Sequence, residues 1–454
     1  MNGLRAAPAV ANATAYAPAR HRAPCDLDLS GSEGPQADAR ILTAALARAT
    51  PLIGRYPNPA ALTELLADRL GVAPDRVLVT AGADEALDRI CRAVLAPGRN
   101  AILPEPTFEM IDRYAALTGG EVRRVPWPDG PFPVHAMIAR ADDETALLVV
   151  VSPNNPTGAV ATPEDVRRLH DAVPDALVLV DFAYVEFADQ DWTTQALALP
   201  RVVLVRTLSK AWGLPGLRVG YAAGAPNVIA WLRAAAGPYP VSALSLAVAE
   251  GMVRDGGSTP ASVVPAVRSA RARLIPLLER LGARPTASQA NFVCVAGNAS
   301  RWIRDALAGV GIATRLLSGR DGERVRIAVP VDAEAYARLE AGLAAALAPD
   351  VVLLTPDIPV RQKWCTALAG RWSVAEVRAP SPAAIDVTLR ERGARRGWMV
   401  TGTPDGVAAA RAAGLVPLGV VVSTDAGGEF TTRLFDAGAA RVLRSPEEIA
   451  SCLI

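Results

Sequence analysis

The stretch that decides the fold is Arg206-Thr-Leu-Ser-Lys210-Ala-Trp-Gly-Leu-Pro-Gly-Leu-Arg218, which continues an apolar strand candidate, Val202 to Thr207. A lysine that ends such a strand, among hydroxyl side chains and before a Gly/Pro turn, is not typical of a protein surface. Its amine can form an imine with an aldehyde. Thr207, Ser209 and Arg218 are suited to a phosphate, the arginine through a bidentate charge-assisted contact. A solvated lysine is the alternative interpretation.

Three polar segments lie upstream of this stretch. Thr80-Ala-Gly-Ala-Asp84 is a strand-to-helix turn whose free amides suit a phosphate, although simple packing also explains its small residues. Ser152-Pro-Asn-Asn-Pro-Thr-Gly158 is a rigid polar turn after an apolar strand. In Leu179-Val-Asp-Phe-Ala-Tyr184, Asp181 ends a buried strand and needs a cationic partner there, unless it only caps the next turn. All four segments would meet at one edge of a parallel sheet.

The pattern around these segments predicts an α/β architecture with a mostly parallel sheet. The strand candidates are Arg76–Thr80, Ala101–Leu103, Glu121–Trp127, Ala146–Ser152, Ala176–Asp181, Val202–Thr207 and Arg218–Ala222. Helical spacing covers Asp84–Leu95, with Asp84 in the capping position, and Pro163–His170.

After residue 240 the sequence is rich in helical patterns up to residue 348. A strand pair is predicted at Asn291–Val295 and Arg324–Val329, followed by a helix at Glu334–Leu347. Ala348-Pro-Asp350 breaks the pattern, and a new strand begins at Val351. We therefore predict a domain boundary near residue 349.

The composition narrows the function classes. With 454 residues, 51% hydrophobic and 20% charged, the chain is expected to form two or three globular domains. A net charge of +1 gives no electrostatic reason for a nucleic-acid or membrane partner, and no apolar run reaches the roughly 20 residues that span a bilayer. The start of the chain is expected to be a loose leader and not a signal peptide. The five scattered cysteines favour reduced thiols in the cytoplasm, without a disulfide framework or a metal site.

Taken in order, these motifs carry a family resemblance over residues 12–348. They also include Tyr16-Ala-Pro-Ala-Arg, Arg55-Tyr-Pro, Gly82-Ala-Asp-Glu, Glu105-Pro-Thr-Phe108 and Arg324-Val-Arg-Ile. The region resembles the class I/II, fold-type I aminotransferases that use pyridoxal 5'-phosphate (PLP), and most closely the histidinol-phosphate aminotransferases. The resemblance implies a segment at 1–45 that belongs partly to a small domain, a PLP-binding large domain at 46–240 and a small α+β domain at 241–348.

The resemblance also implies roles for the matching residues. Lys210 would bind PLP as an imine and move the substrate proton, and Asp181 would pair with the pyridine nitrogen. Phe108 would stack on the ring, while Asn155 and Tyr184 would bind its O3' atom. The phosphate ligands would be the amides of Ala83 and Asp84, the side chains of Thr207, Ser209 and Arg218, and Tyr56 of a second subunit. That last role implies a homodimer with shared active sites. Arg326, Arg315 and Tyr16 would bind substrate, with a solvated surface role as the alternative for Arg315.

Two departures from the family pattern bear on the substrate. The usual Asn-Glu-Asn-Pro is Ser32-Glu-Gly-Pro35 here, and Gly54 replaces an Asn before Arg55-Tyr-Pro. These positions lie nearer to substrate than to cofactor in the family. They therefore leave the identity of the amino donor open.

Residues 349–454 resemble a degenerate haloacid-dehalogenase-like (HAD-like) phosphatase domain, a small α/β Rossmann-like unit. The clearest match is Val400-Thr-Gly-Thr-Pro-Asp-Gly406. Thr355 stands in the position of the nucleophile, Ala379 in that of the lysine, and Gly402 and Gly406 in those of the magnesium carboxylates. Thr355 cannot form the acyl-phosphate, so we expect a silent domain with a structural, regulatory or dimer-forming role. A catalytically active phosphatase domain is the alternative interpretation.

We therefore predict a PLP-dependent aminotransferase. It would move an amino group from an L-amino acid or an amino-alcohol phosphate to a 2-oxo acid. A PLP-dependent decarboxylase or oxidase on the same scaffold is the alternative, because the motifs do not decide which bond at the α-carbon breaks. A PLP-binding regulator is disfavoured, because the sequence has neither a helix-turn-helix candidate nor a basic excess.

Overall fold

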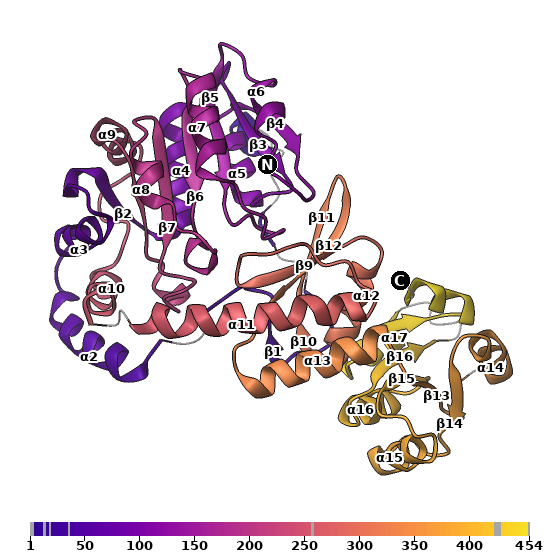
Figure 1. The fold of residues 1–454 in the computed structure, drawn as a ribbon. Coiled ribbons are helices and arrows are strands. Elements are labelled where there is room, and N and C mark those ends of the chain that lie inside the picture. Colours follow the sequence, from indigo (N-terminus) through magenta and orange to yellow (C-terminus); the bar gives the residue numbers. More distant parts are fainter. Residues whose placement is uncertain are drawn as a thin grey trace. The chain divides into compact units, whose positions relative to one another are not determined.

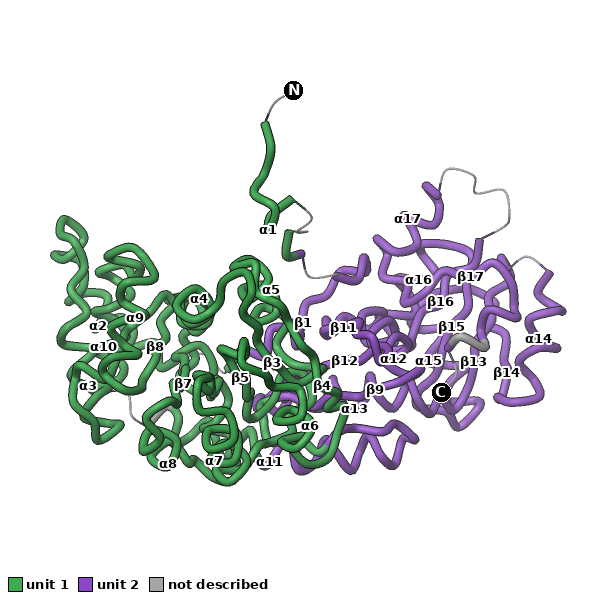
Figure 2. The backbone as a smooth tube through the Cα atoms, turned by 90° about the horizontal axis from the view of Figure 1, so that it is seen from above, with its two compact units in different colours: residues 1–16, 33–268, 287–291 green, residues 17–32, 269–286, 292–454 purple. Residues whose placement is uncertain are grey.

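The computed structural model describes residues 4–11, 15–17, 20–34, 37–255, 258–358, 360–421 and 428–452 (Figure 1). The chain divides into two compact units (Figure 2). The first comprises residues 1–16, 33–268 and 287–291, and the second comprises residues 17–32, 269–286 and 292–454. Each unit therefore combines stretches that are far apart in the sequence.

A seven-stranded sheet with the strand order β2-β8-β7-β6-β5-β3-β4 forms the centre of the first unit. Its strands are β2 (Val77–Thr80), β3 (Asn100–Glu105), β4 (Glu121–Pro126), β5 (Thr145–Val151), β6 (Leu177–Asp181), β7 (Val202–Thr207) and β8 (Gly220–Ala223). All neighbouring strands are parallel except for β8, which is antiparallel to both β2 and β7. The predicted α/β class and the mostly parallel sheet are thus confirmed.

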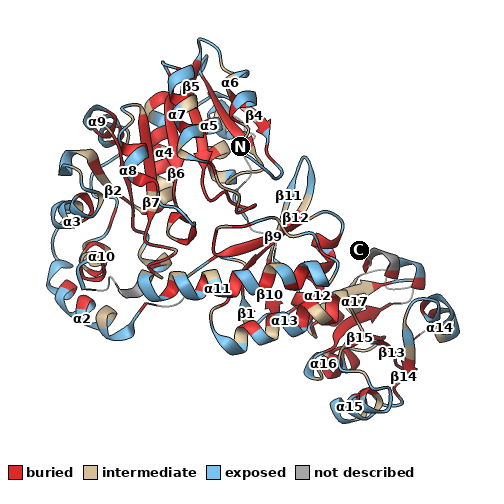
Figure 3. Ribbon diagram, in the orientation of Figure 1, coloured by how far each residue is buried: buried red, intermediate tan, exposed pale blue. Residues whose placement is uncertain are grey.

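Helices pack on both faces of this sheet, so its central strands are buried, whereas the edge strand β4 is mostly not (Figure 3). In β6, Val178 and Val180 join the core that includes α7, whereas Leu177 and Leu179 join the core that includes α4. This explains why the strand candidates are apolar at successive positions. The helices are α1 (Pro8–Ala11), α2 (Ala39–Ala49), α3 (Ala60–Leu70), α4 (Gly82–Val94), α5 (Glu109–Leu117), α6 (Val134–Ile138), α7 (Pro163–Ala172), α8 (Thr193–Leu197), α9 (Pro226–Ala234) and α10 (Ala243–Asp255). Short 3₁₀ turns are η1 (Thr50–Leu52), η2 (Pro74–Arg76), η3 (Val185–Phe187) and η4 (Pro215–Leu217).

The start of α4 corrects one expectation. Asp84 is not the capping residue, because the helix begins at Gly82 and its N-cap is Ala81. The backbone amide of Ala81 donates instead to the side chain of Glu85, at 2.5 Å. Gly82 has a φ of +78°, which lets the chain turn into the helix earlier than the apolar spacing predicts. Asp84 lies in the first turn, where the helix dipole favours a carboxylate.

The second unit contains a three-stranded antiparallel sheet with the order β11-β12-β9. Its strands are β9 (Phe292–Ala296), β11 (Arg315–Gly319) and β12 (Gly322–Ala328). The pairing of β9 with β12 confirms the predicted strand pair. The later part of α11 (Ser258–Arg280), α12 (Ala299–Gly309) and α13 (Ala333–Leu347) share a core with this sheet. A short parallel pair joins β1 (Leu27–Asp28) to β10 (Ile312–Ala313).

Residues from 351 onward add a five-stranded, fully parallel sheet with the order β14-β13-β15-β16-β17. Its strands are β13 (Val351–Leu354), β14 (Ser373–Glu376), β15 (Gly397–Thr401), β16 (Val416–Val420) and β17 (Arg441–Leu443). The accompanying elements are α14 (Arg361–Ala369), α15 (Pro382–Glu391), α16 (Pro404–Ala412), α17 (Glu429–Asp436) and η5 (Pro446–Cys452).

This parallel sheet shares a core with α12 and α13. The rings of Trp302 and Trp398 lie 5.0 Å apart. Their indole N–H groups donate to the carbonyl oxygens of Ala346 and Ala345, at 2.9 and 2.8 Å. The sheet is therefore packed against the end of α13, while the domain limits proposed from the sequence remain predictions.

Within the described residues, none of the helices combines the length and the apolar character that crossing a bilayer requires. All five cysteines are free thiols.

Candidate active site

The polar segments found in the sequence meet at one edge of the seven-stranded sheet. β5, β6 and β7 are parallel, so the segments that follow Val151, Asp181 and Thr207 leave from the same edge. Because β8 is antiparallel to both its neighbours, β2 ends and β8 begins at this edge as well. The topology thereby brings Thr80 and Gly220 to the same place. Ligands of open α/β sheets bind at such an edge.

Asp181 is the buried carboxylate at this edge. Only 3% of the residue is exposed, and its Oδ1 accepts a hydrogen bond from the amide of Ala183 at 2.9 Å. Burial raises the pKa of Asp181 to about 7, while the positive charge of Lys210 acts in the opposite direction. A bound cation would stabilise the ionised form of such a carboxylate. A protonated pyridine nitrogen meets this need.

Lys210 lies close to the side chain of Tyr184, a buried residue. The Nζ atom is 5.5 Å from the centre of the Tyr184 ring, and the backbone carbonyl of Lys210 accepts a hydrogen bond from Gly213. A Cβ atom on Gly34 would lie 2.0 Å from that carbonyl oxygen. The backbone at residue 34 is thus pressed against that of Lys210, at a distance that only glycine permits. Pro35, the last residue of this motif, lies outside the described residues.

The predicted phosphate ligands other than Tyr56 form one cluster at the start of α4. The hydroxyl of Thr207 donates to that of Ser209 at 2.9 Å, and the guanidinium of Arg218 donates to the Ser209 oxygen at 3.3 Å. The same guanidinium pairs with Asp84 at 3.0 Å. Gly220 permits this close packing, since a Cβ there would lie 2.6 Å from the amide nitrogen of Ala83. Hydroxyls, helix-start amides and a guanidinium converge here, and these are the donors that a phosphate ester needs.

The two adjacent amides of the Ser152 to Gly158 turn have different surroundings. Asn154 joins two loops through the Thr107 hydroxyl at 2.8 Å, the Pro106 carbonyl at 2.9 Å and the Thr157 hydroxyl at 2.9 Å. Asn155 beside it is also buried. Phe108 is partly buried against the core that includes α4. Asn154 therefore fixes the loop that leads to Phe108, a structural role that the sequence did not reveal.

Tyr114 is a second residue that the sequence analysis missed. It lies on α5, and burial together with the negative charge of Asp84 raises the pKa of its hydroxyl, whereas Arg218 lowers it. Tyr114 is therefore within electrostatic range of the phosphate cluster. In the sequence, Tyr114 fits the apolar face of an amphipathic helix. No local pattern could therefore have identified it as a residue near the cofactor phosphate.

Two of the other predicted residues lie on exposed parts of the first unit. Tyr56 is 83% exposed and stacks on the ring of Tyr239, with 4.9 Å between the ring centres. Tyr16 is also exposed, and the guanidinium carbon of Arg113 lies 5.8 Å from the centre of its ring. Neither contact involves the cluster around Lys210.

Arg326 and Arg315 belong to the second unit, where they are direct partners on adjacent strands. Arg326 is buried, donates to the carbonyl of Ser30 at 2.7 Å and lies 5.2 Å from the ring centre of Phe292. The register therefore places both arginines on the same face of this strand pair.

The residues at the sheet edge fit PLP. The buried carboxylate of Asp181 suits the pyridine nitrogen, Lys210 offers the amine, and the donors around Arg218 suit the phosphate. The tight backbone contact at Gly220 shapes the phosphate cluster without a side chain in the way. The individual roles of these residues remain predictions.

Comparison with known proteins agrees with this assignment. The sequence profile of the family "Aminotransferase class I and II" matches residues 28–339. The chain is 35% identical over 340 residues to the aromatic amino acid aminotransferase of Mycobacteroides abscessus, covering 73% of this chain and 97% of that protein. It is 32% identical over 276 residues to the histidinol-phosphate aminotransferase of Geobacillus thermodenitrificans, covering 59% of this chain and 75% of that protein.

A solved structure shows the same fold. The histidinol-phosphate aminotransferase of Sinorhizobium meliloti, crystallised with pyridoxal-5'-phosphate, superposes with a TM-score of 0.65 at 25% identity. The match covers 70% of this chain and 90% of that one.

Proposed function

Because this chain belongs to the class I and II aminotransferases, we propose that it transfers the amino group of an aromatic L-amino acid to a 2-oxo acid, with PLP bound covalently to Lys210. The family membership itself makes the chain an aminotransferase that uses PLP. The relatives described above are all aminotransferases, so a decarboxylase, an oxidase or a PLP-binding regulator is not favoured.

The observation that carries the choice of donor is the contact between Gly34 and Lys210. In the histidinol-phosphate pattern an Asn side chain stands at the position of Gly34. Here a Cβ at that position would lie 2.0 Å from the carbonyl oxygen of Lys210, so no amide side chain can occupy the place. Gly34 therefore cannot offer the polar group that an Asn at this position would present to a phosphorylated amino alcohol. The similarity to an aromatic amino acid aminotransferase along nearly its whole length supports the same choice.

We assign a separate role to each residue at the sheet edge. When bound, the cofactor supplies an electron sink for the bonding electrons of the substrate α-carbon. The Nζ atom of Lys210 would take the proton from that carbon and return it. Asp181 would keep the pyridine nitrogen protonated, and Asn155 and Tyr184 would bind O3'. Thr207, Ser209, Arg218 and the amides of Ala83 and Asp84 would hold the phosphate, with Phe108 against the ring.

In the second unit, Arg326 and Arg315 would bind the carboxylate of donor and acceptor, and Tyr16 would line the pocket. A buried arginine forms a strong paired contact with a carboxylate, because its planar guanidinium offers two parallel donors. The fixed position of Arg326 on Phe292 and the Ser30 carbonyl supports this role.

We further propose that the enzyme is a homodimer in which Tyr56 reaches the phosphate of the neighbouring subunit. Tyr56 and Ile53 are 83% and 63% exposed on the same unit, an unusual position for large apolar side chains. Burial in a subunit interface would account for both. We place the dimer in the cytoplasm, where free thiols such as Cys25 stay reduced.

For residues 349–454 we propose a degenerate HAD-like domain without catalysis. Thr355, in the nucleophile position, is fully buried, and its hydroxyl donates to the carbonyl of Val400 at 3.3 Å. Asp357, two residues after Thr355, accepts a hydrogen bond from the backbone amide of Gly402 at 2.5 Å. Both residues thus hold the loops after β13 and β15 together. Magnesium-dependent release of phosphate from p-nitrophenyl phosphate by the intact enzyme, lost on Asp357→Asn, would contradict this proposal.

The donor is tested by half-reactions of the holoenzyme. L-Phenylalanine, L-tyrosine and L-tryptophan are each mixed with the enzyme, beside L-histidinol phosphate, and conversion of the cofactor to its amine form is followed by absorbance. We expect a kcat/KM for the best aromatic donor at least about tenfold above that for L-histidinol phosphate, since one lost polar contact changes binding by about 1.4 kcal/mol or more. A preference for L-histidinol phosphate would reject the aromatic assignment, and no conversion with any amino donor would reject transamination.

A further inference from the structure

A cavity of about 470 Å³ lies in the second unit and shares no residue with the proposed catalytic site. It is lined by residues of the segment 20–22, of α12 and of the stretch from α17 to η5. Four of its side chains are arginines, namely Arg20, Arg22, Arg304 and Arg441, and two are carboxylates, Asp305 and Glu448. From this geometry we infer a binding site for a small dianion with the chemistry of a phosphate monoester.

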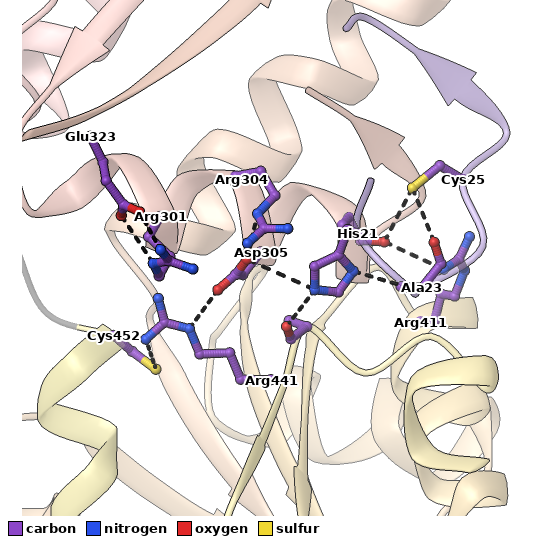
Figure 4. Close-up of polar contacts among 12 residues, drawn as sticks. His21, Ala23, Cys25, Arg301, Arg304, Asp305, Glu323, Arg411, Arg441 and Cys452 are labelled. Carbon is purple, nitrogen blue, oxygen red and sulfur yellow. Dashed lines mark hydrogen bonds and ion pairs between the residues drawn. The ribbon is translucent and has the colours of Figure 1, made fainter. Parts of the chain in front are cut away.

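Asp305 stands at the centre of the charged groups (Figure 4). Only 5% of this residue is exposed, and its two carboxylate oxygens lie 2.7 Å from Nε of Arg304 and 2.7 Å from Nε of Arg441. One carboxylate therefore serves two guanidinium groups that are themselves mostly buried. Asp305 by itself balances only one of these two charges, so a further anion must lie nearby, either Glu448 of the same cavity or a bound ligand.

The neighbouring ion pair does not supply that anion. Arg301 of α12 pairs with Glu323, so this pair is electrically balanced (Figure 4). Burial lowers the pKa of Arg304, and the positive charges of Arg301 and Arg441 act in the same direction, whereas Asp305 opposes them. Arg304 is thus mostly buried beside two further guanidinium groups, with Asp305 as its paired carboxylate.

His21 adds no charge but fixes the arginines on either side of it. Its Nδ1 accepts the backbone N–H of Ala23 at 3.1 Å, and its Nε2 is 3.0 Å from the carbonyl of Ala440. The neutral ring with its proton on Nε2 satisfies both contacts, and burial lowers the pKa of His21 in agreement with this. The ring also packs edge-on against Phe435. Arg20 and Arg22 are therefore held at the mouth of the cavity.

Glu448 supplies the second negative charge of the cavity. Its carboxylate accepts the backbone amide of Arg444 at 3.1 Å, which ties it to the turn before η5. With His21 neutral, four guanidinium groups face two carboxylates, an excess of two positive charges. A phosphate monoester carries about that charge at neutral pH, and guanidinium groups bind phosphate oxygens in pairs. The volume also suits a small-molecule ligand.

A ligand in this cavity would join three stretches that are distant in the sequence. The segment 20–26 would be tied more firmly to β17 and α12, and through them to the parallel sheet. This gives residues 349–454 a function that does not need a phosphatase site: they complete a ligand site in the second unit. The inference concerns a different part of the chain from the proposed catalysis and does not depend on the identity of the amino donor.

The test uses the intact holoenzyme, whose cofactor already fills the phosphate cluster near Arg218. Inorganic phosphate is the probe, compared with chloride at equal ionic strength, and hydrogen–deuterium exchange is measured by mass spectrometry. We expect phosphate to slow exchange at least about twofold in peptides that cover residues 20–26 and 440–448. Phosphate bound at the amino-donor site would not protect these peptides selectively.

Two double variants make the test specific. Arg20→Ala/Arg22→Ala removes two exposed arginines from the cavity, and Arg390→Ala/Arg392→Ala removes two exposed arginines from α15 and its end. Protection by phosphate is expected to disappear in the first variant and to persist in the second, with kcat unchanged in chloride for both. Arg304→Met, which leaves the Arg441–Asp305 pair in place, is expected to weaken phosphate binding at least about tenfold. Equal protection in all variants, or none in the natural protein, would overturn the inference.

Discussion

Gly34 and the carbonyl group of Lys210 are in such close contact that an added Cβ atom would lie 2.0 Å from the oxygen. The backbones at residues 34 and 210 are thereby held against each other. A side chain at residue 34 must push the Lys210 segment away or be displaced itself. The contact links a position that differs from the family pattern to the lysine that we propose as the cofactor-binding residue.

Gly34→Ala is expected to lower kcat/KM at least about tenfold and to destabilise the protein by about 1–3 kcal/mol, as overpacking does in tight sites. Gly54→Ala is the control, because no atom lies within 4 Å of a Cβ built there. Steady-state kinetics and chemical denaturation measure the two effects. If Gly34→Ala and Gly54→Ala have the same kcat/KM and the same stability, the contact between residue 34 and Lys210 does not contribute to function.

Asp181→Asn is expected to stabilise the cofactor-free protein at high pH and to lower its activity. In the cofactor-free protein the pKa of Asp181 is raised to about 7 from an ordinary value of 3.8. The folded state therefore binds a proton that the unfolded chain has released, and the free energy of unfolding falls as the pH rises from about 4 to about 7. Asp181→Asn removes this loss, so the cofactor-free variant should be more stable than the natural protein at pH 8, by an amount on the order of 3 kcal/mol.

The same variant should be a poor enzyme, with kcat reduced about 100-fold or more, because a neutral amide does not hold the pyridine nitrogen protonated. Urea denaturation at pH 5 and pH 8 and donor turnover measure the two properties. If the variant is less stable than the natural protein at pH 8, groups of the protein itself must stabilise the ionised carboxylate of Asp181.

Arg218→Ala is expected to weaken cofactor binding by about 10- to 100-fold, which corresponds to a charge-assisted hydrogen bond of about 1.5–3 kcal/mol. Fluorescence titration of the cofactor-free protein with PLP gives the dissociation constant. The control is Arg254→Ala, because Arg254 is also paired with a carboxylate and its side chain is 53% exposed, against 50% for Arg218. Equal losses in both variants would exclude a specific phosphate contact.

The proposed shared active site predicts complementation between two inactive chains. Lys210→Ala removes the cofactor amine, and Tyr56→Ala removes the phosphate contact offered to the neighbouring subunit. In a mixed dimer one of the two sites contains both natural residues. At limiting PLP we expect the mixture to regain a substantial share of activity, measured after joint refolding. Additive activities of the separate variants would refute the shared site.

Arg315→Gln is expected to raise the KM for the 2-oxo acid by about 10-fold while leaving the protein as stable or more stable by about 0.2–1 kcal/mol. The reason is the register of β11 and β12, which places Arg315 directly opposite Arg326. Like charges in directly opposed positions are unfavourable in a strand pair, and the proposed carboxylate contact is what Arg315→Gln would remove. Arg320→Gln, in the turn between the two strands, is the control. A destabilised variant with an unchanged KM would assign Arg315 to the fold alone.

The sequence predicted the large sheet well because its central strands β5 and β6 are fully buried. Strand β6 reads as an unbroken apolar run that ends in Asp181, and such a run bounded by turn residues needs no tertiary information to be recognised. The placement of Asp181, Thr207 and Lys210 at one edge followed from the parallel order alone. The cap of α4 was predicted incorrectly, because the backbone conformation of Gly82 and the reach of Glu85 are not periodic features.

By itself, the sequence determined which side chains are available to hold a cofactor: a lysine, an aspartate and an arginine follow or precede particular strands, and local residue types decide which atoms could bind it. Tertiary structure alone decided how closely these groups approach. The exclusion of a side chain at Gly34, the like-charged pair of Arg315 and Arg326, and the arginines around Asp305 each join residues from separate segments. Such contacts depend on the packing distances between segments and on the sum of all charges around a site. Neither can be predicted from a short stretch of sequence.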